Sequence, residues 1–263
     1  MRRFDAEYLA STRRGMWERR EALSGLDLDG RTRILDVGCG TGELTRVLVD
    51  ESPAAVVGVD ADTDLLAHAR EHAPVLAGDA RRLPFLDDAF DLVVCQALLI
   101  NLPDPRPTVR EFRRVSSELV CAIEPDNGEV RVESTVEGER ELERRSRSRY
   151  IEGVETDVTL GARARALFDE AGLSELQTAR YDHEKRIEPP YDEAALRAVQ
   201  RKATGTGLDS DRETLLSSAL TEEGFDDLRE RWRAVGHEAV TQMQTRTYRR
   251  TETVPFYLTV GRV

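Results

Sequence analysis

The chain has 263 residues, of which 40% are hydrophobic and 33% charged, and its formal net charge is −12. This length allows one large domain, or a domain with a substantial insertion. The acidic balance argues against nucleic acid as a partner, because phosphate binding requires a basic surface. Only Lys185 and Lys202 are lysines, so arginine supplies nearly all of the 38 basic residues. This bias fits either a salt-rich cytoplasm or a high-GC genome.

The three cysteines, Cys39, Cys95 and Cys121, lie in or beside stretches expected to be buried strands. Their spacing does not suit a metal site, and their odd number argues against a disulfide framework. The first ten residues lack the apolar segment of a secretory signal. The longest nearly apolar run, residues 92–102, is shorter than the roughly 20 residues that span a bilayer. We therefore expect a soluble, cytoplasmic protein with reduced thiols, no metal and no membrane span.

The first half of the chain alternates between apolar strands and amphipathic helices, after one N-terminal helix. We expect helices over residues 4–23, 42–51, 65–72 and 108–115, and strands over residues 33–37, 55–59, 75–77, 90–95 and 119–123. Strands that alternate with helices at this spacing predict a parallel, doubly wound α/β sheet.

The second half of the chain is more charged and more helical. Residues 128–160 include ERELERRSRSRY, which we expect to form a solvated helix. The expected elements that follow are an amphipathic helix over 161–172, a strand over 175–187, helices over 190–245 and a closing strand over 254–263. Ser210 and Glu213 have the spacing of a capping box. A helical insertion therefore precedes the last strand.

Three glycines follow the first expected strand in ILDVGCGTGELT, residues 34–45. Gly38, Gly40 and Gly42 have the spacing G-x-G-x-G, which differs from the dinucleotide fingerprint G-x-G-x-x-G. Asp36 precedes this loop and Glu43 follows it. Two carboxylates would repel a pyrophosphate, whereas they would attract a ligand that carries an ammonium and a sulfonium group. S-adenosylmethionine has both groups and no phosphate.

Two further aspartates follow the next two strands. Asp60 ends the second strand, where a carboxylate can accept hydrogen bonds from ribose hydroxyls, although nucleotide-binding proteins share this feature. Asp79 follows the third strand in GDARRLPF, where it could accept the exocyclic amine of adenine, with the N–H of Ala80 near a ring nitrogen. The alternative for Asp79 is a turn-forming role.

The stretches ILDVGCGTG, VVGVDAD, GDARRLPFLDDAFDLVVC, LPDPRPTVREFRRV and LVCAIEPDN, within residues 33–127, resemble class I S-adenosylmethionine-dependent methyltransferases. The resemblance is to the small-molecule branch, including quinone-type enzymes. It implies a Rossmann-like sheet of seven strands whose last strand is antiparallel. It also implies S-adenosylmethionine as cofactor and S-adenosylhomocysteine as product.

The resemblance also implies a set of cofactor-binding residues. The expected set is Asp36, Gly38, Cys39, Gly40, Gly42, Asp60, Ala61, Asp79, Ala80, Gln96 and Arg14. In that family the glycines contact the methionine and ribose part of the cofactor, and Asp36 holds its ammonium group. Gln96 would lie beside the methionine end. An arginine of the N-terminal helix, Arg13 or Arg14, could pair with the carboxylate of the cofactor.

The expected domain organisation follows from the order of the expected elements along the chain. It comprises an N-terminal helical cap over 1–30, a Rossmann-like core over 31–190 with a charged insertion at about 128–160, a helical insertion or lid over 191–248, and the last strand over 249–263.

Few residues are candidates for catalysis, because methyl transfer from a sulfonium mainly requires alignment. Glu124 and Asp126 follow the fifth strand, at the edge where the acceptor would lie, although a turn is the alternative interpretation. His183 and His237 are weaker candidates, since a lone histidine is more often structural or exposed. Trp17, on the N-terminal helix, could help to close over the cofactor.

The acceptor is expected to be a small, partly apolar molecule. Residues 96–99 lack the Asn/Asp-Pro-Pro-aromatic motif of amino-methylating DNA enzymes, and Val94 precedes Cys95, where cytosine C5 enzymes have a proline. Residues 97–100 would form an apolar wall. Three alternatives stay open: a methyltransferase acting on protein or RNA, a non-catalytic cofactor-binding module, and, less favoured, an NAD-dependent oxidoreductase. The oligomeric state and the methylated atom are not predicted.

Overall fold

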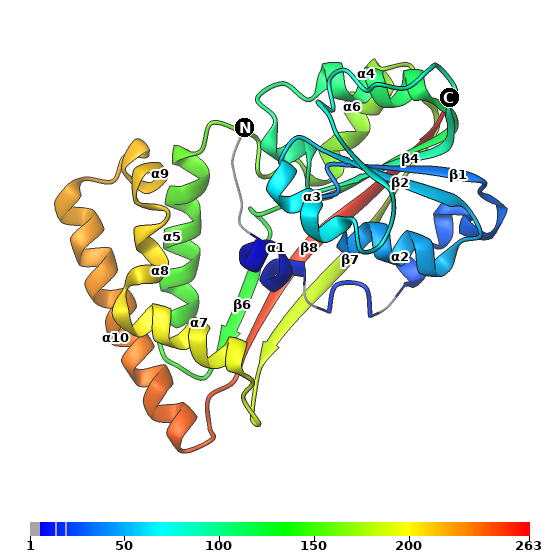
Figure 1. Ribbon diagram of the computed structural model, residues 1–263. Helices are drawn as coiled ribbons and strands as arrows, with labels where there is room; N and C mark the ends of the chain where they lie inside the picture. The colour runs from blue at the N-terminus through cyan, green and yellow to red at the C-terminus, as the bar shows by residue number, and fades with distance from the viewer. Residues whose placement is uncertain (1–5, 14, 19) are drawn as a thin grey trace. The chain divides into compact units, whose positions relative to one another are not determined.

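The computed structural model describes residues 6–13, 15–18 and 20–263, and Figure 1 labels most of its elements. The strands are β1 (Arg33–Val37), β2 (Ala55–Asp60), β3 (Val75–Ala77), β4 (Phe90–Gln96), β5 (Ser116–Pro125), β6 (Arg131–Ser134), β7 (Ser174–Ile187) and β8 (Arg250–Arg262). The α-helices are α1 (Ala6–Arg13), α2 (Glu43–Glu51), α3 (Thr63–Ala69), α4 (Arg106–Val115), α5 (Glu139–Gly153), α6 (Ala164–Glu170), α7 (Glu193–Thr204), α8 (Thr206–Asp209), α9 (Arg212–Ser217) and α10 (Glu222–Gln244). Short 3-10 turns are η1 (Glu21–Leu26), η2 (Leu28–Gly30), η3 (Leu99–Asn101) and η4 (Gly161–Arg163).

The chain forms two compact units. Unit 1 comprises Met1–Asp126, Leu160–Tyr181 and Pro255–Val263, and unit 2 comprises Asn127–Thr159 and Asp182–Val254. The charged segment 128–160 and the helical segment 191–248, which the sequence suggests are separate insertions, both contribute to unit 2.

Unit 1 contains most of the predicted Rossmann-like sheet, and β6 with the adjoining ends of β7 and β8 belongs to unit 2. The strands of this sheet have the order β3-β2-β1-β4-β5-β8, and β7 pairs with β8. Strands β1 to β5 pair in parallel, whereas β8 runs antiparallel to β5. The predicted fold class, including the antiparallel last strand, is therefore confirmed. The structure adds an eighth strand, β6, whose four residues pair with the first part of β8.

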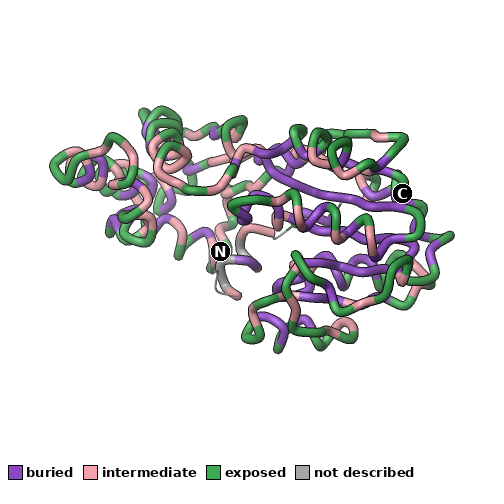
Figure 2. Tube along the Cα trace, turned by 90° about the horizontal axis from the view of Figure 1, so that it is seen from above, coloured by how far each residue is buried: buried purple, intermediate pink, exposed green. Residues whose placement is uncertain are grey.

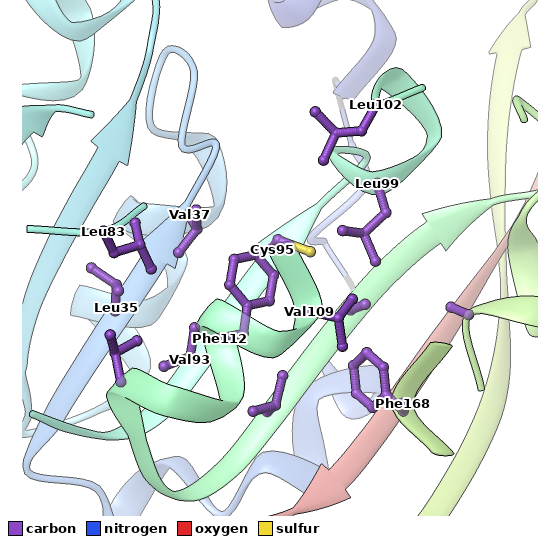
Figure 3. Close-up of a cluster of buried hydrophobic side chains, with 14 of the residues drawn as sticks. Leu35, Val37, Leu83, Val93, Cys95, Leu99, Leu102, Val109, Phe112 and Phe168 are labelled. Atoms are coloured by element: carbon purple, nitrogen blue, oxygen red, sulfur yellow. The ribbon is translucent and has the colours of Figure 1, made fainter. Parts of the chain in front are cut away.

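Apolar side chains on both faces of the central strands explain why helices cover both sides of this sheet. Every residue of β4 is buried, and Figure 2 shows long buried stretches of this kind. One face carries Leu35, Val93 and Cys95, which pack in one cluster with Phe112 of α4 and Phe168 of α6 (Figure 3). Neighbouring residues of a strand point to opposite faces.

On the opposite face of β1, the side chain of Asp36 accepts a hydrogen bond from Thr45 of α2. Because β1, β2, β4 and β5 are parallel, their last residues lie at one edge of the sheet. Asp60, Gln96 and Glu124 belong to these strand ends. Open α/β sheets bind ligands at this edge.

Unit 2 consists mainly of helices. As predicted, residues 190–245 are helical and form α7 to α10. Two glycines allow close helix packing. A Cβ at Gly236 of α10 would lie 2.3 Å from the backbone nitrogen of Ala203 in α7, and a Cβ at Gly153 of α5 would lie 1.8 Å from the carbonyl oxygen of Thr214 in α9.

Two local predictions were wrong. The expected helix over residues 4–23 ends at Arg13 in α1, and Gly15 follows with φ of +72°, a backbone conformation that stops a right-handed helix. The helix expected for ERELERRSRSRY is confirmed as α5, and the short strand β6 before it was not predicted. The capping box is absent, because Asp211 precedes α9 without a side-chain cap, and Ser210 instead donates to the carbonyl of Gly207.

Candidate functional site

The glycine loop connects β1 to α2 at the edge of the sheet where the parallel strands of unit 1 end. Gly38, Gly40 and Gly42 all have positive φ, at 72°, 55° and 89°, which L side chains rarely adopt. The N–H groups of Gly38 and Cys39 donate to the carbonyl of Val59, at 2.7 and 3.1 Å. The loop is therefore fixed against the end of β2.

Asp60 is the second element of the site. Its Oδ2 accepts the N–H of Gly40 and its Oδ1 accepts the N–H of Asp62, both at 2.8 Å. The carboxylate thus joins the glycine loop to the start of α3. Each carboxylate oxygen can accept a second hydrogen bond, so the side chain retains capacity for a pair of hydroxyl groups. Ala61, which follows, is exposed.

Asp36 is 1% exposed, and its Oδ2 accepts a 2.6 Å hydrogen bond from the Thr45 hydroxyl. Burial raises the pKa of Asp36 to about 6, although the Thr45 hydrogen bond and the charge of Arg13 lower it. A buried carboxylate with so little compensation favours a cation beside it. The contact of Thr45 with Asp36 was not predicted. The available signal was a hydroxyl residue on α2, one turn after the glycine loop.

Gln96, at the end of β4, is 3% exposed. Its Nε2 donates to the sulfur of Met16 at 2.8 Å, while its Oε1 is buried with no hydrogen-bond partner among the described residues. A buried carbonyl oxygen without a donor is unfavourable. Gln96 therefore offers an acceptor that an N–H donor such as an ammonium group would satisfy.

The described part of the N-terminal segment lies against the glycine loop. A Cβ at Gly40 would lie 3.2 Å from Leu9 and 3.4 Å from the guanidinium of Arg13. Arg13 itself is 3.4 Å from the carboxylate of Glu43. Arg14, which the sequence analysis places at the cofactor, lies outside the described residues.

Met16 and Trp17 follow α1. Met16 is fully buried, and its carbonyl accepts a 2.6 Å hydrogen bond from the Tyr181 hydroxyl. Trp17 stacks on Tyr181 with ring centroids 6.2 Å apart, and its indole N–H is buried without a partner among the described residues. The contact of Met16 with Gln96 was not predicted, because no sequence pattern indicates it.

Asp79 and Ala80 lie in the loop after β3. Asp79 accepts hydrogen bonds from the backbone N–H and the guanidinium of Arg81, at 2.7 to 3.1 Å, and these bonds lower its pKa. The turn-forming role of Asp79 is therefore present, and its role toward adenine stays a prediction. Ala80 is half-buried against the main cluster of unit 1.

Glu124 is fully buried at the end of β5. Its Oε1 accepts the N–H groups of Leu98 and Leu99, at 3.1 and 2.9 Å, and its Oε2 accepts that of Ile100 at 3.2 Å. Burial raises the pKa of Glu124 to about 7, against the lowering effect of these bonds. In this structure the carboxylate holds the segment after β4, and does not face solvent as a catalytic group would.

The other catalytic candidates belong to different units. Asp126 is half-buried in unit 1. It lies close to Gly161, since a Cβ added at Gly161 would be 2.9 Å from the Cβ of Asp126. His183 and His237 both belong to unit 2. His183 is buried, and His237 is exposed on α10.

The three cysteines are free and buried, as predicted for core thiols, and burial raises the pKa of each. Cys39 packs with Leu66 and Ala69 beneath the glycine loop. Within the described part of the chain, no group of three or more His, Cys, Asp or Glu side chains could hold a metal ion. None of the described helices is long and apolar enough to cross a bilayer.

Comparison with known proteins gives three concordant results. Residues 35–118 match the family described as "Methyltransferase domain". The demethylmenaquinone methyltransferase of Lactiplantibacillus plantarum is 32% identical over 117 residues, which covers 39% of this chain and 49% of that protein. The corresponding Mycolicibacterium paratuberculosis protein is 37% identical over 99 residues, covering 37% of this chain and 43% of the relative. The chain thus spans about half the length of these curated relatives.

Two solved structures share the fold. YcgJ from Bacillus subtilis aligns with a TM-score of 0.54 at 17% identity, covering 91% of this chain and 95% of that one. A proposed methyltransferase from Bacillus halodurans C-125 aligns with a TM-score of 0.56 at 16% identity, covering 94% and 98%. Taken with the family match, they agree with the resemblance that the motifs indicate: residues 35–118 match a methyltransferase domain, and the chain shares its fold with these two proteins.

Proposed function

We propose that the chain binds S-adenosylmethionine at the glycine-loop edge of unit 1 and transfers its methyl group to a small, partly apolar acceptor. The observation that carries this proposal is the pair of buried acceptors next to the loop. Asp36 has a carboxylate with a raised pKa, and Gln96 has a carbonyl oxygen to which none of the described residues donates. The ammonium group of the cofactor would satisfy both.

The remaining contacts follow the shape of the cofactor. Asp60 would accept the ribose hydroxyls through its second lone pairs. The ribose and methionine parts of the cofactor would approach the backbone closely at Gly38, Gly40 and Gly42. Cys39, within this loop, and Ala61, after Asp60, would also line the site. Asp79 and Ala80 would contact adenine at the exposed end.

An arginine would pair with the carboxylate of the cofactor. Arg13 is positioned beside Gly40 and Glu43, and Arg14 is its sequence neighbour. A guanidinium pairs well with a carboxylate through charge-assisted hydrogen bonds.

The chemistry requires little from the protein beyond placement. When bound, S-adenosylmethionine supplies an activated methyl group that a nucleophile can displace in line. The protein contributes alignment, which is worth up to about 7–11 kcal/mol in favourable cases. A base is needed only for a protonated nucleophile, and Asp126 is the proposed group, because the Glu124 carboxylate is already occupied by three N–H donors.

We propose a quinol-type ring as the acceptor class. The curated relatives with the quoted identities are named for demethylmenaquinone. The segment after β4 is also apolar, with Ala97 and Leu98 half-buried. An aromatic acceptor would pack against these side chains.

Calorimetric titration in high salt tests the cofactor. We expect micromolar binding of S-adenosylmethionine and S-adenosylhomocysteine, and no binding of NAD. Asp60→Ala should weaken both by about tenfold or more, since it removes hydrogen bonds from a charged acceptor. Binding of NAD alone would overturn the proposal and favour an oxidoreductase.

A methyl-transfer assay tests the acceptor. Radiolabelled S-adenosylmethionine is incubated with 1,4-naphthoquinol under reducing conditions, with bulk RNA and with a protein extract as separate acceptors. Label in the quinol product supports the proposal, and label confined to RNA or protein contradicts it. Tight cofactor binding with label in none of the three would indicate a non-catalytic module.

A further inference from the structure

The segment after β4, residues 97–101, is held in an unusual conformation. Ala97 has φ of +50°, a left-handed conformation that is uncommon for a residue with a Cβ. The side-chain amide of Asn101 donates to the carbonyl of Ala97 at 2.7 Å. The segment needs external support, because such backbone strain persists only where the surroundings determine it.

This segment also borders the glycine loop. A Cβ at Gly38 would lie 2.9 Å from the side chain of Leu98. Gln96, whose Oε1 accepts no hydrogen bond from any residue that the structure describes, directly precedes Ala97. A shift of the segment would therefore move one wall of the methionine end of the proposed site.

Glu124 provides the support from the neighbouring strand. Three consecutive N–H groups, those of Leu98, Leu99 and Ile100, point to its two carboxylate oxygens. These donors belong to the start of η3, where N–H groups have no partner within the helix. One fully buried carboxylate thus fixes three successive backbone positions.

We propose that Glu124 is a positioning residue for the methionine end of the cofactor. Its carboxylate holds residues 98–100 so that Gln96 and Leu98 keep their places beside the glycine loop. This inference rests on the proposed function, since it assigns a role within the same site. It replaces the direct catalytic role that the sequence suggested for Glu124.

A matched control lies at the other edge of the same sheet. Asp91, near the start of β4, is also buried, at 8% exposed. Its Oδ2 accepts the N–H groups of Thr32 and Arg33, at 2.8 and 3.1 Å. Asp91 therefore resembles Glu124 in burial and in its backbone donors, but it lies at the edge opposite the site.

The test compares Glu124→Gln with Asp91→Asn. Each variant replaces one carboxylate oxygen by an amide group that cannot accept an N–H. We expect Glu124→Gln to lower the melting temperature and Asp91→Asn to lower it less, because the new amide group can take the place of Oδ1, which has no hydrogen-bond partner among the described residues. Glu124→Gln should raise the Kd for S-adenosylhomocysteine by about tenfold, as expected for the loss of a charge-assisted hydrogen bond. Asp91→Asn should change the Kd for the same ligand by less than about twofold.

A second ligand separates positioning from general damage. 5′-Methylthioadenosine shares the adenosine part of S-adenosylhomocysteine but lacks its amino-acid group. We expect Glu124→Gln to leave its inhibition constant, measured in competition with S-adenosylhomocysteine, within about twofold of wild type. Equal weakening of the two ligands, or equal effects of the two variants, would overturn the proposal.

Asn101→Ala covers the case in which Glu124→Gln does not fold. It removes the bond to the Ala97 carbonyl and leaves Glu124 untouched. It should weaken S-adenosylhomocysteine several-fold, and unchanged affinity would contradict the proposal. If wild-type protein fails to bind S-adenosylhomocysteine, the proposed function itself fails. Wild-type binding that neither variant changes would refute only the role of Glu124.

Discussion

Unit 1 and unit 2 both bury carboxylates, but the neighbours of these groups differ. In unit 1, Asp36 accepts from a hydroxyl and Glu124 accepts from backbone N–H groups. Neither has a directly paired cation in the described contacts around it. Burial dominates, and it raises the pKa of Asp36 to about 6 and that of Glu124 to about 7.

In unit 2, the buried carboxylates lie among cations. Lys202 contacts Glu139 and lies 2.7 Å from Glu143, and Arg250 lies 3.1 Å from Glu143 and 2.7 Å from Glu252. Burial alone would raise the pKa of Glu252, but the charges of Arg250 and Lys185 outweigh it and lower that pKa to about 2. The pKa of Glu143 is lowered in the same way, by Arg250 and Lys202 against burial.

The difference separates two uses of a buried charge. In unit 2 the charges compensate one another and join α5, α7 and β8. Both lysines of the chain belong to this ion-pair network, through Lys185–Glu252 and Lys202–Glu139. In unit 1 the two carboxylates lie toward the ends of the parallel strands β1 and β5, where Asp36 is proposed to face the cofactor and Glu124 holds the segment after β4. Separate variants can test each use.

The largest expected effect is on the stability of unit 2. Glu139 is fully buried and accepts from Lys202, Ser134 and the Tyr248 hydroxyl, the last at 3.1 Å. Glu139→Gln should lower the free energy of unfolding by about 3–5 kcal/mol, because it removes one of the two carboxylates that pair with the buried Lys202. Urea unfolding monitored by tryptophan fluorescence measures this.

Glu141→Gln is the matched control on the same helix. Glu141 is exposed and pairs with Arg144 on the surface, and exposed pairs contribute little. The free energy of unfolding of Glu141→Gln should match that of wild type. A similar loss in both variants would show that the buried network has no special role.

The next effect is on pH dependence, where the units should show opposite slopes. In the folded protein the pKa of Glu124 lies above its ordinary value of 4.5. Between these two pKa values the folded state therefore keeps the Glu124 carboxyl protonated, whereas the unfolded state loses this proton. Stability should therefore fall by about 3 kcal/mol as pH rises from 4.5 to about 7. For Glu252 the folded pKa is lower, so its contribution is present above pH 4.5 and is lost as pH falls toward 2.

Unfolding of wild type, Glu124→Gln and Glu252→Gln between pH 3 and 8 measures both slopes. The difference from wild type should change between pH 4.5 and 7 for the first variant, and only below 4.5 for the second. The same slope for both would contradict the contrast between the units.

The smallest effect concerns packing in unit 2. A Cβ at Gly236 would clash with the backbone of Ala203, 2.3 Å away, and overpacking of this kind costs about 1–3 kcal/mol. At Gly207 the nearest atom would be 3.7 Å away, which is ordinary contact. Gly236→Ala should lower the melting temperature and Gly207→Ala should not, as differential scanning calorimetry can determine.

The sequence predicts unit 1 well because its signals are local. The glycine spacing, the apolar strands and the carboxylates at strand ends can each be recognised within a short stretch of sequence. The alternation of strands with helices then predicts the doubly wound sheet. The positive φ values of Gly38, Gly40 and Gly42 follow from the residue type. The cofactor roles of these residues stay predictions.

The sequence predicts non-local contacts poorly. Glu124 meets Leu98 across 26 positions, and Lys202 meets Glu139 across 63. No periodicity links such pairs, so the occupied carboxylate of Glu124 and the charge network of unit 2 appear only in the folded chain. The early end of α1 was predictable, however, because Gly15 is a plain stop signal.

The most direct test of this account measures ligand affinity and stability together in two variants. S-adenosylhomocysteine is titrated into wild type, Glu124→Gln and Glu139→Gln at 10 °C, and the same preparations are unfolded in urea. The account predicts that Glu139→Gln loses most stability and keeps wild-type affinity, while Glu124→Gln loses affinity by about tenfold with the smaller loss of stability. Affinity that simply follows stability across the three proteins would contradict it.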